Sequence, residues 1–429
     1  MIPSRPLRVA ALVDLPRTPL SGGHVKCWER MAEGAAQSEI PLDLTVYFSG
    51  NGPDETLGPR TRLRHLSPVF STANLKFLPY VPDHTDLAPY HPRLARELAP
   101  YDVIHTTDGF FNFARTAAHV SRARGIPLVN SIHTDTPSYA RIFTRMTIEK
   151  IFGTVGFGGW LAYLMIHVWK FPDYQERAMQ RKLVHHLGEC RHVLVTRPED
   201  HALAEKTLGP ARVHHLRRGI DKKIFGPQHR DRAGVERDYR ILPGSTVVLF
   251  VGRVDIGKNI YTLLEAMEKL VAEDRLVHLI VAGVGPAMEE VKRRLGGHAS
   301  TPGFIEAPEL ARLYASADAL AIPSEVETHS MVGLEAMASG CPILVAQKSG
   351  IHALFDDTAG MQVVASASGA WAAALEDFVA RPEKRNMMRA AAVDYSRGRL
   401  AGWDNVLAED LFPIWQQAAG WPIRQREAA

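Results

Sequence analysis

The sequence is poor in cysteine, and its three cysteines follow no pattern. Cys27, Cys190 and Cys341 have neither the spacing of a zinc site nor that of a disulfide framework, so we expect a reducing cytosol. The N-terminal apolar run is too short and too soon interrupted for a signal peptide. A net charge of only +3, without a recognisable DNA- or RNA-binding motif, predicts no nucleic-acid partner.

The chain also lacks the composition of a disordered protein. Hydrophobic residues make up 46% and charged residues 23%, which is ordinary for a soluble globular enzyme. Its 429 residues are too many for one typical domain. The length therefore predicts two domains of about 200 residues each.

A strand, a loop, a helix and a second strand are predicted in succession late in the chain. The apolar run 319–322 ends at a Pro-Ser pair, a helical pattern covers 330–339, and 343–346 is the next buried strand. Glu327 lies in the loop, and Glu335 lies in the helix eight positions later. Ligands of open α/β sheets bind where parallel strands end, next to helix N-termini that attract phosphate. This loop is therefore the first candidate site.

The stretch ETHSMVGLEAMASGCP, residues 327–342, resembles the E-x(7)-E signature of retaining glycosyltransferases of family 4, the glycosyl transferases group 1. The usual form is E-[TG]-F-G-x(4)-E-A-M-A-x-G-x-P. The resemblance implies that Glu327 is a catalytic residue that hydrogen-bonds the donor sugar, and that Glu335 binds the ribose hydroxyls. His329-Ser330 stands where Phe-Gly is usual, so we expect donor preference to depend on this pair. Three neighbours are placed with Glu335 in the nucleoside and sugar site: His329, Ser330 and Met331.

Two cations follow another predicted strand, the β-rich run 246–251. Arg253 and Lys258 lie in the loop between this strand and an amphipathic helix, for which Asn259 is the predicted N-cap. A guanidinium fork and an ammonium group at such a place can neutralise a diphosphate. The family carries G-R-x(4)-K here, and the resemblance implies that both residues hold the donor diphosphate.

Glycines stand in three further loops. Gly23 belongs to a Gly-Gly turn that is either a plain tight turn or the family's phosphate-approaching loop. Gly283 and Gly285 resemble the family's G-x-G-P, which lies near the nucleotide base. Gly350 resembles the second glycine of the family's phosphate-contacting G-G turn, where Ser349 here replaces the first glycine.

A histidine and an aspartate follow the predicted strand 126–132. From the residues alone, His133-x-Asp135 is compatible with a metal site, an acid/base pair or a core histidine, although no third metal ligand is near in the sequence. The family has H-T-[DN]-x-P-x-Y at this point. The resemblance implies that His133 acts at the reacting face and that Asp135 and Tyr139 line the acceptor cleft.

The nineteen residues 151–169 contain no Asp, Glu, Lys or Arg. Their length approaches that of a membrane span, but four glycines and a histidine weaken that interpretation. Abundant aromatic residues, with Lys150 and Lys170 at the two ends, are typical of a monotopic membrane dock. A buried helix and loop of the N-terminal domain is the simpler alternative.

The resemblance extends over most of the chain and implies the α/β architecture called GT-B, in which two Rossmann-like domains face each other across a cleft. We expect an N-terminal acceptor domain over 1–226, a nucleotide-sugar domain over 227–400, and a C-terminal helix over 401–429 that crosses back to the first domain. The implied activity is that of a retaining hexosyltransferase using a nucleoside diphosphate sugar. No D-x-D follows a predicted strand, so we expect a metal-independent enzyme without a cofactor.

The apolar segment 151–169 favours a lipid or lipid-linked glycan as acceptor, and a cytoplasmic enzyme at the inner face of the membrane. Two alternatives remain open. One is a sugar-nucleotide epimerase of the same fold, against which the spacing of the two glutamates and the Gly-Arg loop argue. The other is a non-catalytic, membrane-associated protein that binds sugar nucleotides, which a turnover measurement would distinguish.

Overall fold

The computed structural model describes residues 5–18, 21–72, 86–153, 155–325, 330–355 and 358–421. The chain divides into two compact units, one formed by Met1–Gly219 with Trp403–Ala429 and the other by Ile220–Gly402. The domain boundaries predicted from the sequence, after residues 226 and 400, lie a few positions away from these. The segment that begins at Trp403 belongs to the same unit as the N-terminal residues.

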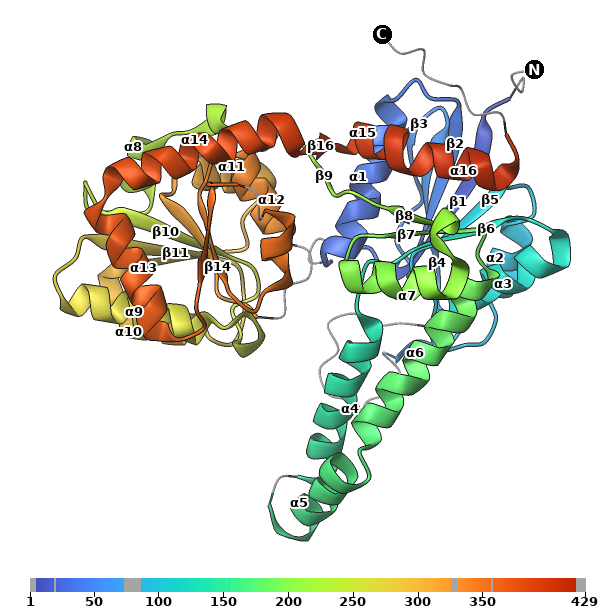
Figure 1. Cartoon of the computed structure of the whole chain (residues 1–429), viewed down its shortest axis with the longest axis horizontal. Helices are drawn as coiled ribbons and strands as arrows, with labels where there is room; N and C mark the ends of the chain where they lie inside the picture. The colour runs from blue at the N-terminus through green and yellow to red at the C-terminus, as the bar shows by residue number, and fades with distance from the viewer. Residues whose placement is uncertain are drawn as a thin grey trace. The chain divides into compact units, whose positions relative to one another are not determined.

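The first unit contains a sheet with the strand order β3-β4-β2-β1-β5-β6-β7-β8 (Figure 1). Neighbouring strands are parallel except for the antiparallel pair β3 and β4. The strands are β1 (Leu7–Pro16), β2 (Leu42–Ser49), β3 (Glu55–Gly58), β4 (Thr61–Leu66), β5 (Val103–Thr106), β6 (Leu128–Ser131), β7 (His192–Val195) and β8 (Val213–His215).

Helices follow most of these strands. They are α1 (Gly23–Gln37), α2 (Pro92–Glu97), α3 (Asn112–Arg124), α4 (Thr136–Phe152), α5 (Gly156–Tyr163), α6 (Phe171–Glu189), α7 (Pro198–Leu208), α15 (Trp403–Val406) and α16 (Phe412–Ala419). Two π-helical turns, η2 (Leu164–Val168) and η8 (Leu407–Leu411), continue α5 and α15.

The second unit contains an all-parallel sheet with the order β12-β11-β10-β13-β14-β15. Its strands are β10 (Thr246–Val251), β11 (Val277–Ala282), β12 (Ala299–Gly303), β13 (Ala319–Ile322), β14 (Ile343–Ala346) and β15 (Met361–Val364). Its helices are α8 (Arg232–Asp238), α9 (Ile260–Ala272), α10 (Met288–Leu295), α11 (Ala307–Ser316), α12 (Met331–Ala338), α13 (Ser368–Ala380) and α14 (Pro382–Arg399). A separate two-stranded sheet pairs β9 (Gly219–Ile220) with β16 (Ala401–Gly402).

Both faces of the second sheet are covered by helices (Figure 1). Val248 and Phe250 pack into a core with α9, α10 and α13, while Val247 and Leu249 pack into another with α8, α11, α12 and α14. Successive residues of β10 therefore face opposite cores, which is why the strand is apolar throughout rather than alternating. The buried parallel strand predicted at 246–251 is confirmed.

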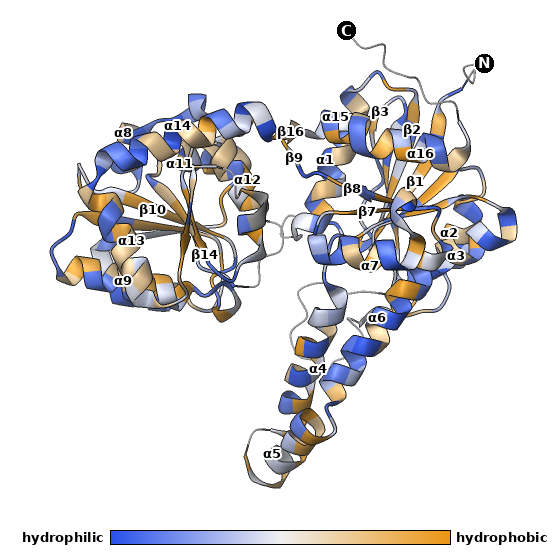
Figure 2. Ribbon diagram, in the orientation of Figure 1, coloured by the Kyte–Doolittle hydropathy of each residue, from blue (hydrophilic) through white to orange (hydrophobic). Residues whose placement is uncertain are grey.

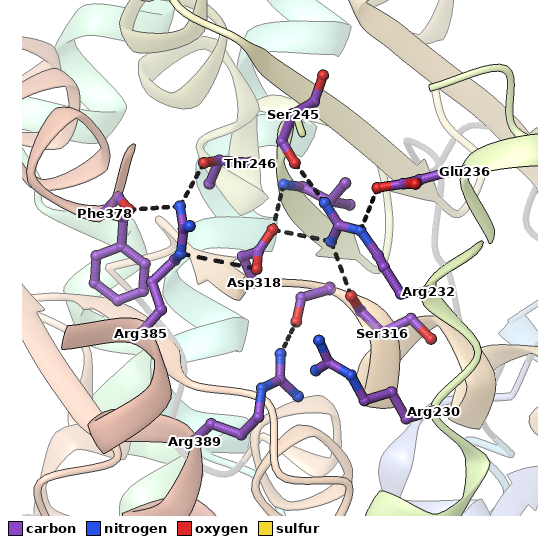
Figure 3. Close-up of polar contacts among 12 residues, drawn as sticks. Arg230, Arg232, Glu236, Ser245, Thr246, Ser316, Asp318, Phe378, Arg385 and Arg389 are labelled. Carbon is purple, nitrogen blue, oxygen red and sulfur yellow. Dashed lines mark hydrogen bonds and ion pairs between the residues drawn. The ribbon is translucent and has the colours of Figure 1, made fainter. Parts of the chain in front are cut away.

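Arginines close the edge of this sheet at which β10 and β13 begin (Figure 3). Arg232 donates to Asp318 Oδ2 (2.9 Å) and to the carbonyl of Ser316 (3.0 Å). Arg389 donates to the carbonyl of Ala315 (2.9 Å), and its burial lowers its pKa. The last carbonyls of a helix have no partner within the helix, so these guanidinium groups complete the C-terminus of α11.

Helices α4 and α6 form an arm that extends away from the first sheet, with α5 at its end (Figure 1). Residues 151–169, for which we gave a buried helix as one alternative, lie at this end, and most of their large apolar side chains are exposed. The buried alternative is wrong because no described element covers the end of the arm. Among the helices that the structure describes, none is both long enough and apolar enough to cross a bilayer.

Candidate active site

In both sheets the strand order reverses beside the first strand, between β1 and β5 and between β10 and β13. Ligands of doubly wound folds bind outside the carboxyl ends of the strands at such a point. The predicted site residues follow these strands in the sequence: Gly23 after β1, His133 after β6, Arg253 after β10 and Ser330 after β13. Each unit therefore carries its own group of candidate residues.

The loop after β10 holds the two predicted diphosphate ligands. The Arg253 side chain is 51% exposed, and it forms an ion pair within the described parts of the chain, a 3.5 Å contact from Nε to Asp255 Oδ2. Asp255 Oδ1 accepts from the backbone N–H of Lys258 (3.0 Å) and so fixes the short helix η5 (Ile256–Lys258). One aspartate thus orders the loop that carries both cations.

Asn259 connects this loop to the end of β13. Its Nδ2 donates to the carbonyl of Pro323 (3.1 Å), and Ser324 Oγ donates to the carbonyl of Gly257 (3.3 Å). Asn259 stands at the N-cap position of α9, as predicted, but its backbone is left-handed (φ +55°) and its side chain makes no capping bond. The predicted N-cap position is therefore confirmed, although the amide nitrogen joins the two loops at the switch point and Oδ1 accepts from the hydroxyl of Thr262 (2.8 Å) instead of a backbone N–H.

Gly283 and Gly285 lie directly against the loop that carries Arg253. A Cβ on Gly283 would be 1.8 Å from the carbonyl oxygen of Gly252, and one on Gly285 would be 2.3 Å from that of Val254. The N–H of Val254 donates to the carbonyl of Val284 (3.0 Å). These glycines therefore have a packing reason, the close approach of two backbones, and their assignment to the nucleoside stays a prediction.

Helix α12 begins at Met331 and is capped by Ser330, whose Oγ accepts from the N–H of Gly333 (3.2 Å). Glu335 lies on its second turn, where Oε2 accepts from the hydroxyl of Tyr314 (3.1 Å) on α11. Burial, and then the nearby carboxylate, raise the pKa of Tyr314 well above its usual value. Tyr314 is thus a permanent donor that holds the Glu335 carboxylate.

The loop after β14 differs from the family pattern at one position. Ser349, in place of the family's first glycine, is fully buried and has an ordinary backbone (φ −71°), so the serine causes no backbone strain. Gly350 is exposed and begins the 3₁₀ helix η7 (Gly350–Leu354). Two predicted residues, Glu327 and His329, lie outside the described residues.

In the first unit, His133 belongs to a chain of hydrogen bonds. Its Nε2 lies 2.7 Å from Ser131 Oγ and accepts from the indole N–H of Trp28 (3.2 Å). Ser131 Oγ lies 2.8 Å from His105 Nε2, and His105 Nδ1 accepts from the indole N–H of Trp415 (2.9 Å). Side chains from β5, β6, α1 and α16 therefore meet at one buried cluster.

The direction of these bonds follows from the two indoles, which can only donate. Because His105 accepts at Nδ1, its ring proton is on Nε2 and is donated to Ser131, whose hydroxyl then donates to His133 Nε2. Burial lowers the pKa of His105 to about 3, so the ring is neutral as this arrangement requires. In the neutral His133 ring, the proton is consequently on Nδ1, and Nδ1–H is a donor.

His24, the residue after Gly23, was not predicted as a site residue, although it directly follows the glycine turn. Its ring stacks on that of His133, with 4.6 Å between centroids and an interplanar angle of 12°. Burial, and then the charge of Arg218, lower the pKa of His24 to about 3. Gly23 itself is exposed and forms the first residue of α1, whose N-cap Gly22 makes no side-chain bond to the helix.

The predicted acceptor residues begin helix α4. Asp135 caps it, since Oδ1 accepts from the N–H of Ser138 (3.1 Å), and Oδ2 accepts from Arg197 (3.2 Å). Burial would raise the pKa of Asp135, but the bonds from Ser138 and the charge of Arg197 hold it below its usual value. Its carboxylate is thus engaged by the fold, whereas Tyr139 on the first turn is exposed.

Within the described ranges of the chain, no group of three or more His, Cys, Asp or Glu side chains is arranged to hold a metal ion.

Comparison with solved structures identifies the fold as GT-B. HepE of Anabaena, solved with UDP and glucose, superposes with a TM-score of 0.66 at 15% identity over 96% of this chain and 98% of HepE. Sucrose-phosphate synthase of Thermosynechococcus elongatus superposes with the same TM-score at 18% identity, over 94% and 97% of the two chains. The predicted fold class is confirmed.

Comparisons of the sequence with a family model and with curated proteins point to glycosyltransferases. Residues 233–394 match the model of the glycosyl transferases group 1. Sulfoquinovosyl transferase SQD2 of Arabidopsis thaliana is 27% identical over 267 residues, which are 61% of this chain and 46% of that protein. D-inositol 3-phosphate glycosyltransferase of Actinosynnema mirum is 32% identical over 224 residues, 49% of this chain and 52% of that protein.

The chain thus spans about half the length of these two curated relatives. The second unit thus carries a match to the glycosyl transferases group 1 over residues 233–394, and the GT-B fold extends over nearly the whole chain, so the resemblance seen in the sequence is confirmed.

Proposed function

We propose that this protein transfers a hexose from a nucleoside diphosphate sugar to a lipid or lipid-linked glycan, with retention of the anomeric configuration and without a metal ion. The observation that carries this proposal is the group of cations and helix termini at the switch point of the second sheet. Arg253 and Lys258 lie on one ordered loop after β10, and α12 begins after β13. A diphosphate at this position meets positive charge from both sides of the switch point.

The reaction breaks the bond between the anomeric carbon and the diphosphate oxygen, and the bonding electrons leave with the diphosphate. Arg253 and Lys258 stabilise the charge that builds up on this leaving group, together with backbone N–H groups at Gly350 and at the start of α12. These groups supply the positive charge that a divalent cation supplies in metal-dependent transferases. Activity is therefore expected to persist in EDTA.

The nucleoside and sugar are held by the α12 segment. Glu335, fixed by Tyr314, accepts from the ribose hydroxyls, and Glu327 accepts from a hydroxyl of the donor sugar. His329, Ser330 and Met331 complete this side of the donor, and Gly283 and Gly285 bring backbone close to the base. Donor preference should change most at His329-Ser330, where the family usually has Phe-Gly.

His133 supplies a neutral N–H donor at the reacting face, because its Nε2 is already occupied by Ser131 and Trp28. No protein nucleophile is assigned. The acceptor hydroxyl then forms the new bond on the face that the diphosphate leaves, and its proton passes to a leaving phosphate oxygen. Tyr139, exposed next to the root of the arm, and the carboxylate of Asp135 face the acceptor in this proposal.

The alternatives differ in what happens to the donor. A thermal-shift screen of nucleotide sugars first identifies the donor, since a bound ligand stabilises the fold according to its affinity. Transfer and hydrolysis of this donor are then measured for the wild type, for Glu327→Ala and for Arg253→Ala. Arg237→Ala is the control, because Arg237 is an exposed arginine of the same unit whose ion pair within the described residues is with its neighbour Asp238.

We expect turnover by the wild type, loss of both reactions in Glu327→Ala and Arg253→Ala, and no change in Arg237→Ala. Binding of the donor without transfer or hydrolysis by the wild type would contradict the proposal and favour a non-catalytic sugar-nucleotide binding protein. Release of an epimerised sugar nucleotide would favour the epimerase.

A further inference from the structure

The end of the α4–α6 arm exposes Phe157 and two tryptophans, whereas no other tryptophan in the described part of the chain is exposed. Phe157, Trp160 and Trp169 are 79%, 56% and 62% exposed, whereas Trp28 and Trp415 are 1% and 0% exposed. The rings of Phe157 and Trp160 stack on each other with 5.7 Å between centroids, so they form one apolar surface. Contiguous apolar surface of this kind marks an interaction site on a soluble protein.

The apolar surface surrounds the end of the arm and is not confined to one helix face. Its exposed aliphatic residues lie at three places along the chain: Ile151 in the last turn of α4, Val155 directly before α5, and Val168 at the end of η2. Within the described part of 151–169, only Ala162 is buried, while the large apolar residues that are not exposed are half-buried: Phe152, Leu161, Leu164, Met165 and Ile166. A surface that is apolar on several sides suits immersion in an apolar layer better than the one-sided contact of a groove.

The stem of the arm is polar, as its blue segments show (Figure 2). Arg141 on α4 lies 3.8 Å from Asp173 and 3.6 Å from Glu176, both on α6. Ser138 Oγ also donates to Glu176 (3.5 Å). These bridges join the first turns of α4 to the first turns of α6, so the end of the arm is presented on a braced pair of helices.

Positive charge surrounds the border between stem and end. Residues 136–189 contain seven basic and four acidic residues, and no acidic residue stands between Glu149 and Asp173. Lys150 and Lys170 lie at the two ends of the uncharged stretch. Lysines beside an aromatic, apolar surface match the anionic phosphates and the headgroup layer of a bilayer.

We propose that the end of the arm, residues 151–169, is a monotopic anchor that enters the headgroup layer of an anionic bilayer. Trp160, Trp169 and Tyr163 lie at the headgroup level, Phe157 and the aliphatic residues reach toward the acyl chains, and Lys150 and Lys170 meet lipid phosphates. This anchor stands on the arm alone and goes beyond the transfer reaction. A second copy of the chain is a less suitable occupant, because it would bring the same positive border against this one.

The test is sedimentation of the full chain with vesicles, without any sugar donor. Vesicles of phosphatidylglycerol mixed with phosphatidylcholine are compared with vesicles of phosphatidylcholine alone. In Trp160→Ser/Trp169→Ser, we expect the partition coefficient on anionic vesicles to fall by about tenfold or more, because two large apolar side chains are lost from the layer. In Lys150→Gln/Lys170→Gln, we expect a fall of about fivefold for each lysine.

The matched control is Leu242→Ser/Leu276→Ser, which removes two exposed apolar side chains from the second unit and should leave partitioning unchanged. Unchanged partitioning of the tryptophan variant, or equal binding of the wild type to neutral vesicles, would overturn the proposal. A dimer that forms without vesicles and is lost in the tryptophan variant would overturn it too, in favour of a second copy. None of these measurements depends on transferase activity, so failure of the proposed function would appear separately.

Discussion

The two sheets have the same reversal of strand order, yet they present opposite chemistry at their switch points. The second sheet offers formal charge: Arg253 is half exposed, on a loop ordered by Asp255. The first offers neutral, buried rings, in which His105 and His133 are joined through Ser131. One topology can thus hold either a charged ligand group by electrostatics or a neutral one by directed hydrogen bonds, depending on the side chains at the strand ends and in the elements that follow them.

The second sheet also shows that the number of arginines near a sheet edge does not identify a ligand-binding site. Arg232 and Arg389 at the opposite edge are held by Asp318 and by carbonyls that end α11. Arg253 is held less firmly among the described residues, since its ion-pair partner there is a single carboxylate at 3.5 Å. Cations that the fold has already neutralised complete its structure, and those that it leaves available point to a ligand.

The largest effect is expected from removing the charge in the second unit. Arg253→Ala should lower kcat/KM by about 100- to 1000-fold, the usual cost of losing one group that stabilises the charge of the transition state. Urea unfolding should change by less than about 0.5 kcal/mol, because the side chain is largely exposed. Steady-state kinetics and urea titration check both parts. A large loss of stability would show that Arg253 is structural, like Arg389.

A smaller effect is expected from breaking the hydrogen-bond chain in the first unit. Ser131→Ala removes the shorter of the two hydrogen bonds to His133 Nε2 and leaves only the one from Trp28, so the ring is held less firmly with its proton on Nδ1. We expect kcat to fall by about tenfold and the unfolding free energy to fall by about 1–3 kcal/mol, since the N–H of buried His105 is left unpaired.

Ser300→Ala is the control for this variant, because Ser300 Oγ bonds His278 Nε2 at the same 2.8 Å in the second unit. It should lower stability without lowering kcat. Equal loss of kcat in both variants would mean that the effect on Ser131 is only structural.

The pH dependence of the free energy of unfolding should distinguish the buried histidine cluster of the first unit from the charged loop of the second. The pKa of His105 is about 3 in the folded chain, below its unfolded value, so the folded state binds fewer protons than the unfolded state at acidic pH. The contribution of neutral His105 to the free energy of unfolding is present above about pH 6.5. It is lost as pH falls toward 3, at about 1.4 kcal/mol for each pH unit. His105→Gln should therefore reduce the slope of unfolding free energy between pH 6.5 and 5.5 by about this amount.

Arg253→Ala should leave that slope unchanged, since a guanidinium does not titrate in this range. Urea titrations at the two pH values measure both slopes. A His105→Gln slope equal to that of the wild type would show that His105 is not kept neutral by the fold.

The smallest effect is expected from the residue that holds Glu335. Tyr314→Phe removes one hydrogen bond to this carboxylate, so KM for the donor should rise by about three- to tenfold, while kcat stays the same. Tyr239→Phe is the matched control, because its hydroxyl bonds Glu309 at 2.9 Å in the same unit. A change in kcat rather than KM would place Glu335 in the chemical step.

The sequence predicted the elements whose evidence is local. Apolar runs located strands such as β10 and β13, and residue types at strand ends located Arg253 and Lys258. The buried chain to His133 was missed because Trp415 and His105 are 310 positions apart, and no pattern in either segment refers to the other.

Exposure could not be predicted for residues 151–169. An apolar, aromatic stretch has the same composition whether another element covers it or not, so the choice between core and surface depends on tertiary contacts. Asp135 shows a related limit of the sequence. Its spacing from His133 matched a site motif, but the spacing did not predict that its carboxylate also caps α4 and binds Arg197.

The length of α4 sets a reach for the acceptor. The helix has 17 residues, which at 1.5 Å per residue is about 26 Å, and its cap Asp135 stands two positions after His133. If the end of the arm rests in a bilayer with the helices upright, His133 is held roughly this far above the lipid headgroups. A bare headgroup then falls short of the reacting face, whereas the outer end of a glycan chain on a lipid carrier reaches it. The arm would thus act as a spacer that selects acceptors by height above the membrane.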